Sequence, residues 1–203
     1  LYYSAYTTDA SGNFIGRELV RLDPQSGQIR FFDVYPGGYW SSPRSLTTLN
    51  GRLFFLADGA GNGAELWGFN PAIDTAPQLL RDIWPGGGSS GIANLTASGG
   101  KLYFTANDGS TDEELWVSDG TPGGTSRVAD INQTTYGSDP QPVVSSGGKL
   151  FFTAYTDASG WELHRLDPAT GSVQKLEIRS GSNGSVPGGN GGGFADLNGT
   201  LYF

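Results

Sequence analysis

Two short motifs recur in phase along the 203 residues of this chain. An aromatic strand motif returns after 52, 49, 48 and 51 residues, and a Glu-Leu motif returns after 47, 49 and 48 residues. The strand motif begins at Leu1, Leu53, Leu102, Leu150 and Leu201, and the Glu-Leu motif begins at Glu18, Glu65, Glu114 and Glu162. A fixed period of this length indicates stacked supersecondary units. We therefore predict one repeat domain over 1–203, with repeats 1–52, 53–101, 102–149 and 150–200, and a further copy that starts at 201–203.

Each period predicts a meander of four short antiparallel strands. In the third period, β-branched and aromatic residues concentrate in 102–106, 114–118, 126–131 and 141–145, and Gly, Pro, Asn and Asp separate these runs. Tight turns close one hairpin per period, because a type I′ turn needs two central residues that tolerate positive φ. The predicted turns are Asn50-Gly51, Gly99-Gly100, Gly147-Gly148 and Asn198-Gly199.

The second strand of each repeat carries apolar residues at successive positions, as in Leu102-Tyr103-Phe104. Successive strand residues point to opposite faces, so both faces of each small sheet need to be covered. A β-propeller satisfies this need, since every blade is packed between two neighbours. The predicted fold class is thus all-β, a β-propeller of four-stranded antiparallel blades with about four repeats of 48–52 residues. Residues 194–197 could pair with 1–6 and close a four-bladed ring, or the repeats could belong to a larger propeller.

Composition excludes several functions. With no Cys and one His, the chain has no disulfide framework, no thiolate zinc site and no Cys nucleophile. A formal net charge of −8, with the nine Arg and three Lys scattered singly, argues against nucleic acid as a partner. No apolar run approaches the roughly 18–20 residues of a transmembrane helix, so we expect no membrane span. Few Lys and an acidic balance favour an extracellular or cell-surface protein.

The third repeat contains Glu114-Leu115-Trp116-Val117-Ser118-Asp119-Gly120-Thr121-Pro122-Gly123-Gly124-Thr125. This run closely resembles the signature of the bacterial ELWxxDGT repeat family, and weaker versions cover the whole chain. The resemblance implies tandem propeller-type blades in large, often secreted or cell-surface bacterial proteins, and it implies no activity. The first and fourth repeats depart from the signature, because they carry Val20 and His164 in place of Trp and lack Asp-Gly-Thr.

The repeated polar residues are interpreted as structure. A catalytic acid is needed once, whereas Glu18, Glu65, Glu114 and Glu162 recur in every repeat, and a buried acid of this kind accepts hydrogen bonds from neighbouring N–H groups. Asp119 and its counterparts Asp23, Asn70 and Asp167 are expected to stabilise tight turns. We predict that Trp67, Trp116 and the lone His164 fill core positions between blades.

Aromatic residues in the loops suggest a binding surface. Aromatic rings stack on the apolar face of a pyranose, while neighbouring amides and carboxylates bind its hydroxyl groups. The candidate ligand-binding residues are Tyr35, Tyr39, Trp40, Trp84 and Tyr136. The alternative is that Trp40 and Trp84 pack between blades.

Aspartates in Asp/Gly loops suggest a weak calcium hypothesis, since oxygen ligands on flexible loops suit that ion. The candidate ligands are Asp58, Asp108, Asp112 and Asp157. No EF-hand loop and no calcium-binding nonapeptide repeat is present, so no cofactor is expected, with Ca²⁺ left as a possibility.

These observations give one leading function and two alternatives. The leading hypothesis is a non-enzymatic extracellular module that acts as a structural or adhesive platform for other protein subunits or cell-surface material. The first alternative is a glycan-binding, lectin-like propeller. The second is a carbohydrate-active enzyme, which would need two non-repeated acids facing each other.

Overall fold

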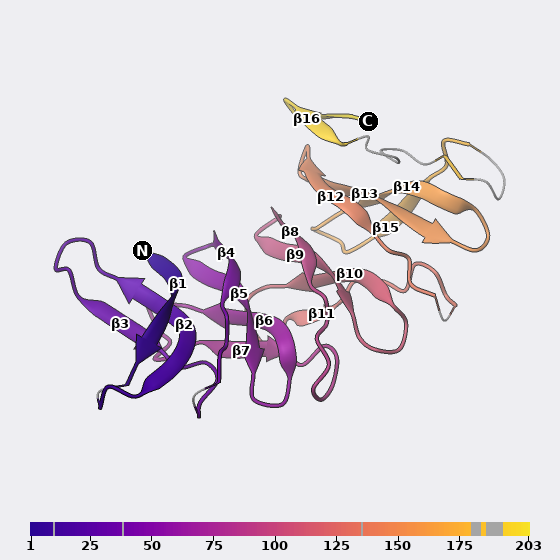
Figure 1. The fold of residues 1–203 in the computed structure, drawn as a ribbon. Helices are drawn as coiled ribbons and strands as arrows, with labels where there is room; N and C mark the ends of the chain where they lie inside the picture. The colour runs from indigo at the N-terminus through magenta and orange to yellow at the C-terminus, as the bar shows by residue number, and fades with distance from the viewer. Residues whose placement is uncertain (10, 38, 135, 180–183, 186–192) are drawn as a thin grey trace. The chain divides into compact units, whose positions relative to one another are not determined.

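The computed structural model describes residues 1–9, 11–37, 39–134, 136–179, 184–185 and 193–203 (Figure 1). Within these ranges the regular secondary structure consists of β-strands. The chain divides into two compact units, and each is described by itself. The first comprises 1–90 and 120–122, and the second comprises 91–119 and 123–203. In the described ranges no helix has the length and apolar character needed to cross a membrane.

The first unit contains two antiparallel sheets. Their strands are β1 (Tyr2–Thr8), β2 (Phe14–Leu22) and β3 (Ile29–Phe32) in one sheet, and β4 (Arg44–Leu49), β5 (Arg52–Gly59), β6 (Gly63–Phe69) and β7 (Gln78–Arg81) in the other. Neighbouring strands in the sequence are neighbours in each sheet, so both sheets are meanders.

The second unit contains two four-stranded sheets and one hairpin. The first sheet holds β8 (Ala93–Ser98), β9 (Lys101–Asn107), β10 (Glu113–Ser118) and β11 (Thr125–Arg127). The second holds β12 (Gln141–Ser146), β13 (Lys149–Thr156), β14 (Gly160–Leu166) and β15 (Val173–Leu176), and the hairpin is β16 (Ala195–Leu197) with β17 (Thr200–Tyr202). The predicted four-stranded antiparallel meander is confirmed in three complete sheets.

The predicted type I′ turns are confirmed by their backbone angles. Asn50 and Gly51 have φ of 51° and 75°, and the Gly99-Gly100, Gly147-Gly148 and Asn198-Gly199 turns have two positive φ values each. These turns join the first and second strands of successive sheets, for example β4 to β5. The strand expected over 126–131 is wrong in its length, because β11 ends at Arg127. The backbone N–H of Ile131 donates instead to the side chain of Glu114.

The cores lie between successive sheets, as the apolar strand motif predicts. In the first unit Leu19 and Phe32 of the β1–β3 sheet form one buried cluster with Leu53, Phe55 and Phe69 of the next sheet. In the second unit Tyr103 and Leu115 form a cluster with Val143, Leu150 and Phe152. Leu53, Phe54 and Phe55 are all buried, so the second strand is covered on both faces. Phe151, in contrast, is only partly buried.

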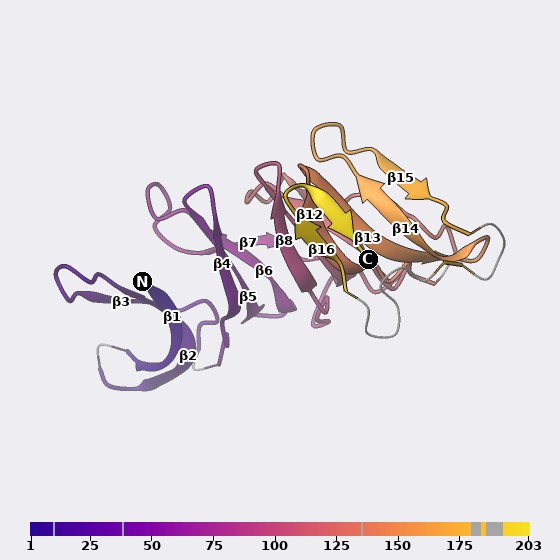
Figure 2. The same ribbon diagram turned by 90° about the horizontal axis from the view of Figure 1, so that it is seen from above.

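First strands lie side by side in the second unit, where β12 contacts both β8 and β16 (Figure 2). The Thr96 hydroxyl of β8 donates to the backbone carbonyl of Val143 in β12 at 2.9 Å. The Ser146 hydroxyl at the end of β12 donates to Asp196 in β16. Successive sheets joined along their first strands are what a propeller arrangement requires. Among the described strands β1 pairs with β2 and β16 pairs with β17, so closure of a ring stays a prediction.

Candidate functional sites

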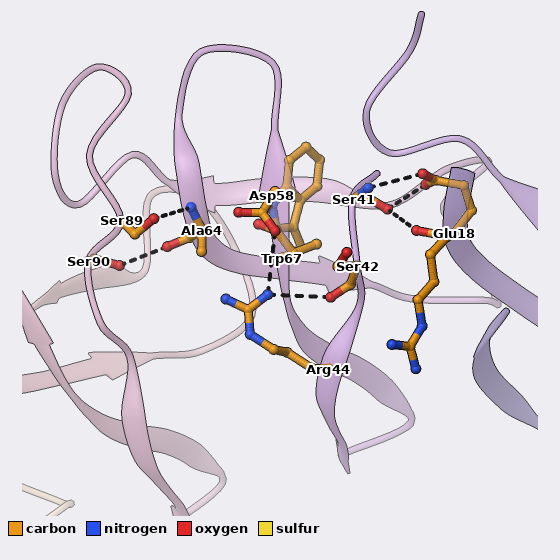
Figure 3. Close-up of polar contacts among 11 residues, drawn as sticks. Glu18, Ser41, Ser42, Arg44, Asp58, Ala64, Trp67, Ser89 and Ser90 are labelled. Atoms are coloured by element: carbon orange, nitrogen blue, oxygen red, sulfur yellow. Dashed lines mark hydrogen bonds and ion pairs between the residues drawn. The ribbon is translucent and has the colours of Figure 1, made fainter. Parts of the chain in front are cut away.

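The repeated glutamates are buried and bind the segment that leads from one sheet to the next. Glu18 on β2 is fully buried and accepts hydrogen bonds from the backbone N–H groups of Val34, at 3.0 Å, and Ser41, at 3.1 Å. The Ser41 hydroxyl also donates to Glu18 (Figure 3). Three donors therefore fix one carboxylate to the crossover between β3 and β4. We call this arrangement the Glu–Ser clamp.

The bond from the serine hydroxyl to the glutamate recurs in each of the other repeats, although Glu162 has one carboxylate oxygen without a partner among the described residues. Glu65 accepts from the hydroxyl of Ser90 at 2.7 Å, Glu114 from that of Ser138 at 2.6 Å, and Glu162 from that of Ser185 at 2.5 Å. The structural interpretation of the four glutamates is consistent with these bonds. Sequence analysis missed the four serines, although Ser41, Ser90, Ser138 and Ser185 recur after 49, 48 and 47 residues and form a third motif in phase.

The clamp serine also bonds to the following sheet. The backbone carbonyl of Ser41 accepts from the N–H of Asp58 on β5 at 2.7 Å, and that of Ser138 accepts from the N–H of Tyr155 on β13 at 2.8 Å. Ser41 thus joins β2 to β5 of the next sheet, and Ser138 joins β10 to β13 of the next sheet.

Burial raises the pKa of three clamp glutamates. Desolvation is the largest cause for Glu18, Glu65 and Glu114, and it outweighs the donated hydrogen bonds, which lower the pKa. For Glu65 the pKa is raised to about 7, with the neighbouring Asp82 adding to the shift. Glu65 therefore changes protonation in the range where ordinary glutamates are already ionised.

The Trp of the repeat packs against the core, and its indole N–H donates a hydrogen bond to a backbone carbonyl. Trp67 donates from Nε1 to the carbonyl of Ala57 at 3.1 Å, and Trp116 donates to Ala106 at 3.2 Å. His164 holds the same register position and is also buried, stacked on Phe152 with ring centroids 5.6 Å apart. Asn70 and Asp167 accept a hydrogen bond from the backbone N–H two residues later, as expected of turn residues. Asp119 begins the equivalent turn, where its N–H donates to the carbonyl of Gly124.

The two candidate tryptophans are exposed rather than packed between sheets. Trp40 is 51% exposed and Trp84 is 37% exposed. Trp40 meets two residues that sequence analysis missed, Tyr6 at 5.7 Å and Phe14 at 6.3 Å between ring centroids. We call Tyr6, Phe14 and Trp40 the aromatic cluster.

The contacts given for the other aromatic candidates are with residues outside the aromatic cluster. Tyr35 and Tyr39 stack on each other with centroids 4.9 Å apart. Trp84 packs over Gly88, and Tyr136 is largely exposed. The cluster could have been anticipated from the sequence, because Tyr6 and Phe14 flank the same loop between β1 and β2.

Two of the candidate calcium ligands, Asp108 and Asp112, bond within their own loop, and the other two contact distant segments. Asp58 forms an ion pair with Arg44 at 3.6 Å, Asp108 accepts from the N–H of Ser110 at 2.9 Å, and Asp112 accepts from Asn107 at 3.1 Å. The backbone N–H of Asp157 donates to Asn132. Among the residues that the structure describes, no group of three or more His, Cys, Asp or Glu side chains could hold a metal ion.

Two non-repeated acids do meet in the second unit. Burial raises the pKa of Glu113, as does a side-chain hydrogen bond to Asp139 in which Glu113 carries the proton, and the charge of Asp139 adds to the shift. The carboxyl groups of a retaining glycosidase stand about 5 Å apart to admit the sugar between them. A directly bonded pair leaves no such space, so this pair lacks glycosidase geometry.

No family model matches the sequence, and no curated protein matches it. Solved structures do match. One, from a study of two prolyl endopeptidases, gives a TM-score of 0.52 at 14% identity over 86% of this chain and 24% of that chain. An acylaminoacyl peptidase from Pyrococcus horikoshii gives 0.50 at 13% identity over 86% and 25%, and a puromycin hydrolase gives 0.50 at 17% over 82% and 26%.

The chain thus spans about a quarter of the length of these peptidases. Their matching parts are β-propeller domains, and identities this low show the fold alone. The fold and the recurring clamps together define the class: an all-β protein of β-propeller-like sheets.

Proposed function

We propose that this chain is a non-enzymatic, extracellular β-propeller module that acts as a structural or adhesive platform for other proteins or cell-surface material. The observation that carries the proposal is the Glu–Ser clamp. The acid that recurs in every repeat is buried and bonded to the crossover, so its chemistry serves to hold the sheets together. A platform of this kind needs a rigid scaffold that presents variable loops.

The resemblance to the bacterial ELWxxDGT repeat family supports the same function. Its Glu is the clamp acid Glu114, its Leu is the buried Leu115, and its Trp is the tethered Trp116. Each signature residue thus has a structural role in this chain, as expected of a family defined by its scaffold. The proposal includes the secreted or cell-surface location that this resemblance implies.

Single substitutions of the recurring acids test the proposal. In a scaffold, Glu18→Gln, Glu65→Gln and Glu114→Gln should each lower the melting temperature by several degrees, since each leaves buried donors unpaired. In an enzyme, one of them would abolish hydrolysis of a polysaccharide panel without lowering the melting temperature. That second result would overturn the proposal.

Glycan binding is the second candidate, and the exposed aromatic cluster favours it. The rings of Tyr6, Phe14 and Trp40 contact one another and together offer the stacking surface that a pyranose needs. A glycan array tests it, with Trp40→Ala expected to abolish binding. Tyr136→Ala, which removes an exposed aromatic of the other unit, is the matched control. Failure of the unmodified chain to bind any glycan would exclude this candidate.

A further inference from the structure

A pocket opens in the second unit beside the only histidine of the chain. Its volume is about 430 Å³, within the range of about 300–1,000 Å³ that is usual for small-molecule sites. The lining combines His164 and Lys175 with Asn132, Thr134, Thr156 and Asp157. These residues come from the segment after β11, the β13–β14 turn, β14 and β15. The pocket is separate from the aromatic cluster, which lies in the first unit.

The pocket lies at the position where the fourth repeat differs in sequence from the second and third, which carry Trp in place of His164. His164 pairs with Phe152 in the sheet, as Trp67 pairs with Phe55 and Trp116 with Phe104. Both tryptophans reach an alanine carbonyl of the adjacent strand with their indole nitrogen. An imidazole is smaller than an indole, and His164 bonds instead to the carbonyl of Glu162. Space that an indole would occupy is therefore free in this repeat.

The hydrogen bonding of His164 leaves one nitrogen available to a ligand. Nδ1 lies 3.0 Å from the carbonyl oxygen of Glu162, which can only accept, so Nδ1 carries the proton. Burial lowers the pKa of the imidazole, with the charge of Lys175 acting in the same direction, so the ring is neutral at neutral pH. Nε2 is then an acceptor, and within the described residues it has no hydrogen-bond partner. His164 lines the pocket and is only 3% exposed, so its ring is shielded from open solvent.

The walls of the pocket are held in place by their own hydrogen bonds. Asn132 is buried, donates to the carbonyl of Tyr136 at 3.1 Å and accepts from the N–H of Asp157 at 3.3 Å. The hydroxyls of Thr156 and Ser159 bond to each other at 2.7 Å. Asn132 thus ties the crossover segment to the β13–β14 turn, and the two sides of the pocket are joined before a ligand arrives.

We propose that this pocket binds a neutral sugar unit. Its polar groups favour a ligand with both donors and acceptors, because the His164 acceptor and the Asp157 carboxylate need donors, while the Lys175 ammonium, which pairs with Glu177 at 3.5 Å, still has N–H groups to donate. Sugar hydroxyls supply both. A carboxylate ligand has no proton for Nε2, and a carboxylate or a phosphate also meets the negative charge of Asp157, so the lining disfavours anions.

The single histidine provides a direct test by proton NMR, because its imidazole C–H signals have no counterpart elsewhere in the chain. Glucose, galactose, mannose and N-acetylglucosamine are titrated separately into the unmodified chain, and acetate and phosphate are titrated in parallel. At least one sugar should shift the His164 signals saturably, with Kd on the order of 1 mM. No saturable shift with any sugar, or a saturable shift with acetate or phosphate alone, would overturn the proposal.

Variants locate the binding site by calorimetry with the sugar that binds. His164→Trp restores the residue of the second and third repeats and fills the pocket, so affinity should fall at least tenfold in a folded protein. Lys175→Gln should weaken binding about tenfold by removing one charged donor, while the exposed Lys101→Gln is the matched control and should change nothing. Trp40→Ala should leave this binding intact. Unchanged affinity in His164→Trp would contradict the assignment of the pocket.

Discussion

Glu114 accepts two hydrogen bonds from Ser138, one from its backbone N–H at 3.0 Å and one from its hydroxyl at 2.6 Å. Both residues are buried, and the carbonyl of Ser138 accepts a further bond from Tyr155. One buried pair therefore links β10, the crossover and β13. Since Glu18 and Ser41 make the same contacts in the first unit, the link is a property of the repeat.

Removing a clamp hydroxyl should destabilise the chain. Ser41→Ala and Ser138→Ala each delete a charge-assisted hydrogen bond in a buried site, and we expect a loss of about 1–3 kcal/mol in the free energy of unfolding. Urea denaturation followed by tryptophan fluorescence measures it. Ser11→Ala, in an exposed loop, is the control and should have an effect below about 0.5 kcal/mol. Equal effects at buried and exposed serines would contradict the clamp.

Stability should fall as pH rises from about 4.5 to about 7. Glu65 has a pKa of about 7 when folded, against an ordinary value of 4.5, so the folded chain binds more protons than the unfolded chain between these values. Between these pH values the folded chain holds a proton that the unfolded chain has lost. The free energy of unfolding therefore falls as the pH rises. The raised pKa values of Glu18 and Glu114 act in the same direction.

Urea denaturation at about pH 5 and about pH 8 measures this effect, which is up to about 3 kcal/mol for Glu65 because one pKa unit is about 1.4 kcal/mol. Glu65→Gln should make the remaining pH dependence shallower. Stability that rises over this interval would show that the buried glutamates are not the controlling groups.

Alanine at Gly63 should destabilise the chain more than alanine at the nearby Gly61. Both have positive φ, 61° and 82°, so alanine strains the backbone at either position. An added Cβ at Gly63 would also collide with the backbone carbonyl of Gly88, while at Gly61 nothing lies within 4 Å. We expect Gly61→Ala to cost about 1 kcal/mol and Gly63→Ala at least about 2 kcal/mol more. Thermal denaturation compares the two, and equal costs would refute the close approach of Gly88.

Asp139→Asn should stabilise the chain at neutral pH. Asp139 adds to the raised pKa of Glu113, and its φ of 45° is one that asparagine tolerates. A neutral amide at this position can donate to Glu113 without charge repulsion, so we expect a gain of about 0.5–1 kcal/mol. Asp157→Asn is the control at an exposed site. Loss of stability would mean that the two carboxyl groups share a favourable proton.

The repeat motifs predicted the sheets well because strand pairing is local. Every predicted I′ turn joins two strands that are adjacent in the sequence, so Asn50-Gly51 determines the register of β4 and β5 from Leu49 to Thr47, up to the shift between Thr47 and Arg44. The role of Glu114 was also predictable, since a recurring acid on a buried strand needs donors.

Other features were not predicted because they depend on contacts between distant segments. Ser138 lies 24 residues after Glu114, and only its recurrence in phase with Ser41, Ser90 and Ser185, not a local pattern, marks it as the donor. The neighbourhood of Tyr6 and Phe14, which flank the β1–β2 loop, was predictable, but their contact with Trp40 was not, because Trp40 meets them only after the crossover folds back over Gly16. The pocket at His164 depends on the segment at Asn132, which is brought there by the crossover.

A double-mutant cycle on Glu114 and Ser138 is the most direct test of the clamp. Glu114→Gln, Ser138→Ala and the double variant are denatured with urea, and the coupling free energy between the two sites is calculated. Because the two side chains bond directly in a buried site, we predict a coupling of about 1–3 kcal/mol. Additive effects, with a coupling below about 0.3 kcal/mol, would contradict the account of how these sheets are held together.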